Sequence, residues 1–331
     1  MEEKVVVRQA YLNELEEIRE FISQEWKLSV KYYQQFHVAF DKLWFVIGKG
    51  EISDEIYGAC GIIITNEGKG KDAQLVLLYG NKSSNDFSSI SLLKYISEDM
   101  GFRSVSSCGV RKNVIPLYKW LGYSSGKMNH YYKIGYVSDF KIADIDEVKR
   151  SEYKKGHNSL ELITEAIELE NFDFKRYEEN VPRKDMWCVK HRYFDESKHN
   201  YNVYKVLDEE KKWNSIIVMR EVEALGSKSC KIVDFIGEDK DISELGEAFD
   251  ILMKSKGYEF LDFYNIGIDG EYLTAAGFLL HDKDDKNVIP HFSEPVLKEN
   301  KDIFYISNTD GMHLYVGDAD QDRSVYGYME K

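Results

Sequence analysis

The strongest constraint on the fold of this chain is an order of predicted elements that occurs twice. Residues 5–134 read as β-α-β-β-β-α-β-α-β, because strand-like apolar runs alternate with segments whose apolar residues recur at helical spacing. The second half repeats that order more loosely. The two copies agree best at Leu117–Tyr123 (LYKWLGY) and Tyr272–Phe278 (YLTAAGF), each a short helix that follows a strand and contains a glycine stop. A chain of 331 residues has room for two such units.

The first unit is predicted from its apolar patterns. Its strands are expected at Val5–Arg8, Leu43–Gly48, Ile56–Thr65, Gln74–Tyr79, Arg103–Val110 and Lys127–Ile134, and its later helices at Phe87–Met100 and Ile115–Leu121. In the second unit, strands are expected at Leu160–Thr164, Tyr201–Leu207, Ser215–Glu221, Cys230–Ile236 and Phe260–Ile266. Helices are expected at Ile242–Ser255 and Gly270–Ala276, and a largely helical stretch interrupted at Pro182 is expected at Phe172–Tyr193. The acidic, polar residues 139–150 break the strand pattern, so we expect domains at 1–138 and 151–331 joined by this connector. No low-complexity linker separates them, which favours two domains that pack together.

Composition excludes several classes of protein. Hydrophobic residues make up 43% of the chain and aromatic residues 14%, which is too apolar for a disordered protein. The formal charge of −14 argues against general nucleic-acid binding, which needs clustered Lys and Arg. The N-terminal residues do not resemble a secretory signal, and the apolar runs are too short to span a membrane, so a cytoplasmic location is expected. The four cysteines are isolated in the sequence, which predicts reduced, mostly buried thiols.

The segment around Leu117–Tyr123, with a strand and Asn113 before it and a Tyr-containing strand after it, resembles the end of the GNAT (N-acetyltransferase) fold. There, an aromatic-bearing short helix lies beside acyl-CoA. The resemblance implies an α+β protein of two consecutive GNAT-like domains, each with a mixed, mostly antiparallel central sheet flanked by helices. The second half also resembles a GNAT-related group found among polysaccharide-biosynthesis proteins, through the motifs KIVDFIG at 231–237, FLDFYNIG at 260–267, IPHFSEP at 289–295 and GDADQDR at 317–323.

The loop that would hold the CoA pyrophosphate departs from the usual GNAT pattern, Q/R-x-x-G-x-G/A, in both halves. In the first half, Gly80–Ser89 has serines near the glycine positions, and the residues expected to bind the cofactor are Gly80, Lys82, Ser83, Ser84 and Asn113. In the second half, Gly237–Ser243 carries three carboxylates, which would repel a pyrophosphate. If acetyl-CoA or another acyl-CoA binds, we therefore expect it in the first half.

Tyrosines are the candidate acids of the first half, because acyl transfer to an amine often needs a group that protonates the leaving thiolate. Tyr118 resembles the position that faces the thiolate in many GNAT enzymes, and Tyr123 and residues 130–132 (HYY) are further candidates. A Tyr-rich strand beside a helix is also a common packing surface, which is the structural alternative.

Two carboxylates in apolar strands mark the second half. Asp262 and Tyr264 share one face of their strand, and Asp234 lies on the adjacent one. Carboxylates within core strands are costly unless they are paired, and they often occur at functional sites. We therefore predict Asp234, Asp262 and Tyr264 as catalytic candidates with Tyr118; the alternative is that they are hydrogen-bonded for structural reasons, for example to Arg323.

His291 could approach these carboxylates as a base, or could be a solvent-exposed loop histidine. The tail carries Asp318, Asp320, Asp322 and Arg323, and in an extended conformation its aspartates would share one face. It lacks the Gly and Glu of a calcium-binding EF-hand, so no metal site is predicted. We predict His291 and these tail residues as substrate-binding, through a sugar's hydroxyls, with internal ion pairs as the alternative for the aspartates.

The preferred hypothesis is an acyl-CoA-dependent N-acyltransferase, or a degenerate relative, that acts on an amino sugar or nucleotide-linked sugar of surface polysaccharide synthesis. One alternative is a Fem-type aminoacyl transferase, which uses paired GNAT-like domains without the CoA loop. Another is a non-catalytic sugar-binding or scaffolding protein that kept the fold. The sequence makes no prediction of oligomeric state.

Overall fold

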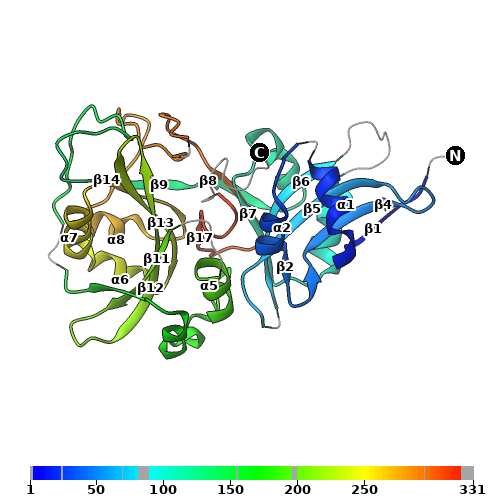
Figure 1. The fold of residues 1–331 in the computed structure, drawn as a ribbon, viewed down its shortest axis with the longest axis horizontal. Coiled ribbons are helices and arrows are strands. Elements are labelled where there is room, and N and C mark those ends of the chain that lie inside the picture. The colour runs from blue at the N-terminus through cyan, green and yellow to red at the C-terminus, as the bar shows by residue number, and fades with distance from the viewer. Residues whose placement is uncertain are drawn as a thin grey trace.

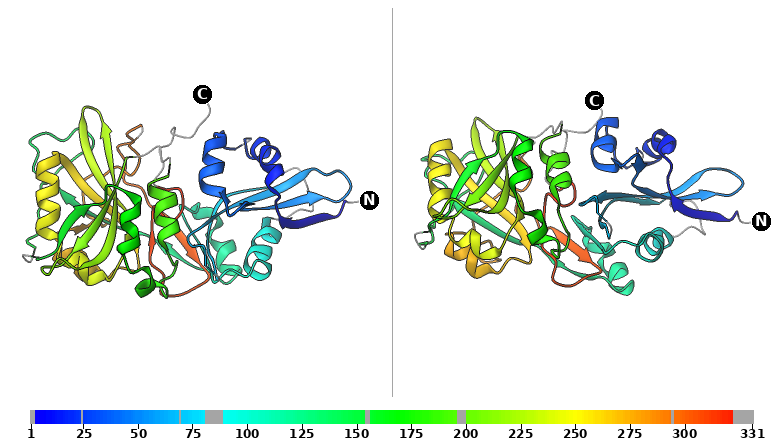
Figure 2. Two further views of the ribbon diagram at one scale, coloured as in Figure 1. Left: turned by 60° about the horizontal axis from the view of Figure 1, so that its bottom comes forward. Right: turned by 90° about the horizontal axis from the view of Figure 1, so that it is seen from below.

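The structure of the protein is a computed structural model that describes residues 3–23, 25–68, 70–80, 89–153, 156–195, 200–293 and 295–321. It has two lobes, each built around one large sheet (Figures 1 and 2). A two-stranded ribbon of β2 (Val38–Ala39) and β3 (Lys42–Leu43) stands beside the first. Among the described residues, no helix is both long enough and apolar enough to cross a membrane.

The first sheet has seven strands in the order β1-β4-β5-β6-β7-β16-β8. Their bounds are β1 Val5–Gln9, β4 Phe45–Gly50, β5 Ile56–Ile64, β6 Asp72–Gly80, β7 Ser104–Cys108, β16 Phe304–Ser307 and β8 Ser124–Lys127. Only β6 and β7 run parallel; the other described pairs of this sheet are antiparallel.

Helices cover both faces of this sheet because its strands are apolar on both sides. Phe45 and Ile47 pack in one cluster with α1 (Leu15–Ile22) and α2 (Val30–His37). Val46, between them, points the other way and packs with α3 (Ser89–Lys94) and α4 (Ile115–Trp120). The predicted helix Phe87–Met100 is described from Ser89 and ends in a π-helical turn, Tyr95–Asp99.

The second sheet has the order β10-β11-β12-β13-β14-β9-β15, with β17 also paired to β14. Its strands are β10 Ser159–Leu162, β11 Tyr201–Leu207, β12 Trp213–Ala224, β13 Ser227–Ile236, β14 Tyr258–Ile266, β9 Asn129–Ile134, β15 Leu279–Leu280 and β17 Leu314–Tyr315. One face packs on α6 (Asp239–Ser243), α7 (Gly246–Lys256) and α8 (Gly270–Ala275). The predicted α+β class, with two mixed, mostly antiparallel sheets flanked by helices, is confirmed.

The two sheets exchange strands. The predicted strand Lys127–Ile134 divides at Met128: β8 stays in the first sheet, whereas β9 joins the second, where it pairs with β14 from Phe260↔Ile134 to Asn265↔Asn129. In return, β16 from the C-terminal part lies between β7 and β8 of the first sheet. Figure 1 shows β8 leading toward the first lobe and β9 beside β14 in the second. The division at 139–150 stays a prediction, but each sheet takes a strand from the other side of it.

The predicted helix Phe172–Tyr193 is mostly a different structure. It contains a 3₁₀ turn at Phe174–Tyr177 and an α-helix, α5, only at Met186–Tyr193, and another 3₁₀ turn, Ala166–Asn171, ends just before it. The helix starts late because Pro182 cannot donate a helical hydrogen bond, and because Asp185 caps the helix by accepting from the backbone N–H of Cys188 at 3.0 Å. The single predicted helix Ile242–Ser255 is likewise two helices, α6 and α7.

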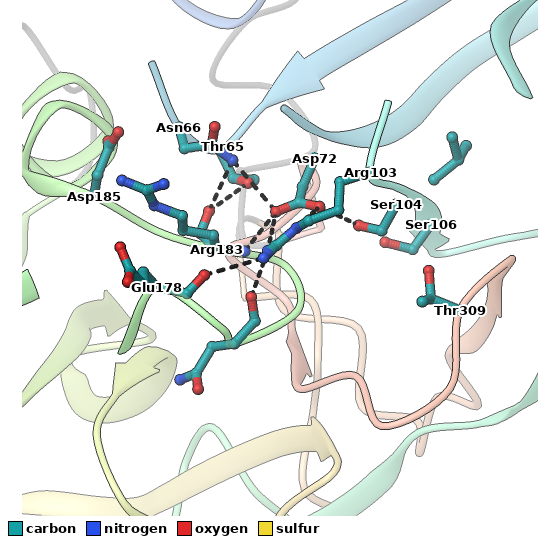
Figure 3. A network of polar contacts seen from close by, with 12 residues as sticks. Thr65, Asn66, Asp72, Arg103, Ser104, Ser106, Glu178, Arg183, Asp185 and Thr309 are labelled. Atoms are coloured by element: carbon teal, nitrogen blue, oxygen red, sulfur yellow. Dashed lines mark hydrogen bonds and ion pairs between the residues drawn. The ribbon is translucent and has the colours of Figure 1, made fainter. Parts of the chain in front are cut away.

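A buried carboxylate ties the segment before α5 to the first sheet (Figure 3). Asp72, fully buried, accepts two hydrogen bonds from Arg103, at 2.6 and 3.1 Å, and one from Ser104 at 2.6 Å. It also accepts the backbone N–H of Arg183 at 2.7 Å, while Arg103 donates to the carbonyl of Asn180 at 2.6 Å. The lobes are also joined by one apolar cluster that runs from α1 and α2 to α5 and the near face of the second sheet.

Candidate functional site

The first sheet opens between its two parallel strands. β6 and β7 pair only at Asp72↔Ser104, Ala73↔Val105 and Gln74↔Ser106, and they diverge beyond Gln74. In the diverging part β6 is bulged against β5, and Leu77 has a φ of 52°. A left-handed leucine is strained, and a bulge removes one residue from the regular hydrogen-bond ladder; both features concentrate at functional sites.

A cleft of about 300 Å³ lies in this opening. Its walls are residues 75–78 of β6, the end of β7 with residues 109–111, and Tyr118 of α4; Asp320 and Gln321 reach it from the C-terminal segment. We call it the donor cleft, after the sequence-based prediction that an acyl donor would bind in the first half. A second cleft of about 680 Å³ adjoins it, shares residues 109–111 and Gln321 with it, and is lined by Asn113, His291 and residues 299–304; we call it the outer cleft. The two predicted residues Tyr118 and His291 are thus brought to adjoining clefts.

Tyr118 is 4% exposed, and its ring packs edge-on against that of Tyr123, with centroids 5.6 Å apart. Burial raises the pKa of its hydroxyl far above the ordinary value, so the group is a protonated donor at neutral pH. Tyr123 instead pairs its hydroxyl with Ser97 and does not line the donor cleft. Of the predicted phosphate-binding residues, Gly80 ends β6, whereas Lys82, Ser83 and Ser84 lie outside the described residues.

The corresponding opening of the second sheet is filled by the chain itself. β13 and β14 are also parallel, but β17 pairs with β14 at Asn265↔Tyr315 and Ile266↔Leu314. From the other side, Gly317 donates its backbone N–H to the carbonyl of Val233 in β13 at 2.8 Å. A Cβ on Gly317 would lie 2.6 Å from this carbonyl, so only glycine allows the close approach.

Asp234 lies in this filled opening. Lys184 forms ion pairs with Asp234 and with Asp318, the latter at 2.6 Å, and Tyr193 donates to Asp234 at 2.6 Å. All three charged groups are buried. Burial raises the pKa of Asp318 to about 6; Lys184 opposes this shift and the neighbouring Asp234 adds to it.

The described tail aspartates face different partners. Asp318 belongs to the Lys184 cluster, whereas Asp320 accepts from the hydroxyl of Tyr32 at 2.8 Å and lines the donor cleft. The segment is turned rather than extended, so these two side chains do not share a face. Asp322 and Arg323 lie outside the described residues.

Asp262 and Tyr264 form a separate cluster beneath His291. Both oxygens of Asp262 contact the Lys231 ammonium, at 3.2 and 3.3 Å, and one lies 3.4 Å from Nε2 of His130. The ring of Tyr264 stacks on His130, with centroids 3.9 Å apart, and its hydroxyl donates to the carbonyl of Lys301 at 3.0 Å. Burial raises the pKa of Asp262, but Lys231 and His130 together lower it by more than burial raises it, so this carboxylate is charged.

Sequence reasoning missed both lysines of these clusters. Lys231 of β13 lies opposite Asp262 of β14 in the parallel pair. Each is a charged residue in an otherwise apolar strand, and their opposite charges are the signal that could have revealed the pair. Lys184 sits in a polar segment that carries no such signal. His130 was predicted for the first half, but the strand exchange places it beside Asp262 in the second sheet. Within the described ranges, no group of three or more His, Cys, Asp or Glu side chains could hold a metal ion.

Comparisons with known proteins identify the fold. The sequence matches no protein-family model and no curated protein. The structure is similar to that of a GCN5-related N-acetyltransferase from Anabaena variabilis, with a TM-score of 0.56 and 13% identity, over 92% of this chain and 72% of that one. It is also similar to a conserved protein of unknown function from Enterococcus faecalis, described as a probable N-acyltransferase, with a TM-score of 0.54, 11% identity and the same coverages. The chain therefore has the fold of the GNAT-type N-acetyltransferases.

Proposed function

We propose that the protein is an acyl-CoA-dependent N-acyltransferase whose acyl donor binds in the donor cleft of the first sheet. The observation that carries this proposal is the contrast between the two parallel strand pairs. β6 and β7 diverge around a cleft and carry a strained bulge, whereas the space beside β13 is filled by Leu314–Gly317. One opening is kept free at a cost in backbone strain, which is expected of a binding site.

Tyr118 is the proposed acid. In the reaction, the acceptor nitrogen attacks the thioester carbonyl, the C–N bond forms, and the C–S bond breaks with the electron pair going to sulfur. The thiolate then takes the proton of the Tyr118 hydroxyl. The Tyr118 hydroxyl carries its proton at neutral pH, as an ordinary tyrosine does, so the proton is available when the thiolate develops.

The finer parts of the proposal concern the two substrates. We propose acetyl-CoA as the donor, with its pyrophosphate near Gly80–Ser89 and Asn113 beside it. The loop of the second half argues against a second donor site, since Glu238 is engaged by Arg176 and Lys240 and its neighbours are acidic. We propose an amino sugar of surface polysaccharide synthesis as the acceptor, a suggestion supported by the sequence resemblance of the second half.

Calorimetric titration of the purified protein with acetyl-CoA and with CoA tests the donor site. Micromolar binding that is weakened by Lys82→Ala and by Ser84→Leu supports a donor in the first half. Lys240→Ala, in the corresponding loop of the second half, is the matched control and should leave binding unchanged. Absence of binding to the wild-type protein rules out the acyl-CoA mechanism.

Tyr118→Phe tests the acid. We expect kcat for acetyl transfer to fall by about 100-fold, the usual contribution of a general acid, with acetyl-CoA affinity unchanged because the ring remains. Tyr123→Phe is the control, since Tyr123 is a buried neighbour that does not line the cleft. Equal kcat values for the two variants would exclude Tyr118 as the acid.

A further inference from the structure

The wall of the outer cleft contains a buried imidazole to which the described residues offer no hydrogen bond of ordinary geometry, although the Gln321 backbone lies near enough to raise its pKa a little. His291 is 6% exposed, and its ring packs edge-on against Tyr264, with centroids 5.2 Å apart, and against Phe292 at 4.8 Å. Neither Nδ1 nor Nε2 makes a hydrogen bond of ordinary geometry to any described residue. Leaving a buried polar atom unpaired is energetically costly, so such a side chain in a cleft wall indicates that a ligand or water completes it.

The ring is uncharged at neutral pH. Burial, followed by the nearby charge of Lys231, lowers the pKa of His291 to about 3, against the smaller opposing influence of Asp262. A neutral imidazole has one nitrogen that donates and one that accepts. It can therefore bind a hydroxyl or an amine from either side.

The cluster beneath His291 fixes its position. Lys231 donates to the carbonyl of Pro290, the preceding residue, at 3.0 Å, and the same ammonium is held by Asp262. Asp262 is in turn 3.4 Å from His130 of β9. A fully buried ion pair is weak evidence for stability, but here it anchors the backbone next to the unpaired ring, which is how supporting residues orient a binding group.

The remaining lining of the outer cleft is largely polar and suits a hydroxylated ligand. Asn113 and Gln321 offer amide groups, which both donate and accept, as hydroxyls require. Lys301 and Lys112 lie 5.9 Å from the ring centroids of Phe292 and Phe304, and Glu299 and Asp302 offer carboxylates that can take an amine beside these cations and Arg111. The same cleft shares Gly109–Arg111 with the donor cleft, so an amine held here would lie beside the donor.

We propose that His291 is an acceptor-binding residue of the outer cleft, that it hydrogen-bonds a hydroxyl or amine of a polyhydroxylated amine, and that Asp262 and Lys231 are its positioning residues. The reaction that would follow binding rests on the proposed function. The binding of the amine to His291 does not depend on it. This assignment extends the proposed function by making the active site composite: the first sheet binds the donor, and the loop 289–292 of the second half recognises the acceptor.

Direct binding is measured by NMR on the full-length protein labelled with ¹⁵N-histidine. Glucosamine is the probe, and His291→Gln assigns the His291 signals by their loss. We expect glucosamine to shift the ring ¹⁵N signals of His291, because one nitrogen gains a donor or an acceptor. If no histidine ring ¹⁵N signal of the wild-type protein shifts at saturating glucosamine, the proposal is overturned, even where the variant that assigns the signals does not fold.

The kinetics of acetyl transfer to glucosamine distinguish a residue that contacts the acceptor, His291, from one that only positions it, Asp262. His291→Gln should raise KM for the acceptor about tenfold, the loss expected for one hydrogen bond, while KM for acetyl-CoA stays constant. Asp262→Asn should raise the same KM less, because it acts only through the position of the ring. His157→Gln, at an exposed histidine paired with Glu209, is the control and should change neither constant.

Failure of this inference can be told apart from failure of the proposed function. If the wild-type protein binds acetyl-CoA by calorimetry but glucosamine leaves His291 unaffected, the acceptor assignment is wrong and the donor site stands. If acetyl-CoA does not bind but glucosamine shifts the His291 signals, the acyltransfer proposal is wrong and the outer cleft remains a binding site for hydroxylated amines.

Discussion

Replacing Lys184 by methionine should destabilise the protein strongly at neutral pH. Lys184 is 5% exposed and is the ion-pair partner of Asp234 and Asp318, which are 2% and 3% exposed. Removing one partner of a buried ion pair leaves an uncompensated charge and costs about 3–5 kcal/mol. With an unfolding entropy of about 2.1 cal/mol/K per residue over 331 residues, a loss of about 4 kcal/mol lowers Tm by roughly 6 °C.

The loss should also depend on pH. The pKa of Asp318 is raised to about 6 by burial even with Lys184 present, so the native state binds a proton more tightly than the unfolded chain, and this carboxylate lowers stability as the pH rises from 3.8 towards 6. Without Lys184, the charge of Asp234 repels that of Asp318 with no cation between them, so the native pKa of Asp318 rises further. We therefore expect the deficit of Lys184→Met to shrink between pH 7.5 and pH 5.5, as Asp318 takes up a proton.

Thermal and urea unfolding followed by circular dichroism at both pH values measures these effects. Lys228→Met is the matched control, because Lys228 pairs with Glu221 and Glu223 near the surface, where an ion pair contributes at most about 1 kcal/mol. Adding Asp318→Asn to Lys184→Met should restore part of the stability by removing one buried charge. A Lys184→Met variant as stable as Lys228→Met at pH 7.5, or equally unstable at both pH values, would refute the reasoning.

Two further variants probe the joint between the lobes and the junction of the clefts. Asp72→Ala should lower the free energy of unfolding in urea by about 3–5 kcal/mol, because Arg103, Ser104 and the N–H of Arg183 lose a buried acceptor. Asp72→Asn should lower it less, since the amide oxygen still accepts. Equal losses in the two variants would show that the stability depends on the negative charge of Asp72 and not on its acceptor atoms. Gly109→Ala should lower the free energy of unfolding by about 1–2 kcal/mol, because Gly109 has a φ of 87°. It should also weaken acetyl-CoA binding measured by calorimetry, since a Cβ would lie 2.2 Å from the side chain of Gln321. Unchanged affinity would show that this junction does not shape the donor cleft.

The segments that line the donor cleft were largely predictable because their signals are local. The strand Gln74–Tyr79, the helix that carries Tyr118 and the glycine after it are contiguous segments whose apolar spacing specifies their type. Their order resembles that of the GNAT fold, and this resemblance is what places Tyr118 near the opening between the two strands. The bulge at Leu77 was not predicted, since nothing in the run QLVLLY distinguishes a bulged strand from a regular one.

The clusters of the second half were predicted only in part. The costs of burying Asp234 and Asp262 indicated that each needs a partner, and both have one. Which partner they have depends on contacts between residues far apart in the chain, such as Asp234 with Lys184 and Asp262 with His130. The catalytic role predicted for these carboxylates and for Tyr264 stays a prediction.

By itself, the sequence determined the type and order of most strands and helices, because hydrophobic periodicity and glycine stops act over a few residues. Only the tertiary structure decided which sheet each strand joins. The ladder that pairs β9 with β14 and β16 with β7 is made by backbone groups, which are the same in every strand, so the local pattern of Asn129–Ile134 does not specify its neighbour. That exchange, with the return of Leu314–Gln321 through the second opening to the donor cleft, sets which residues meet at the site.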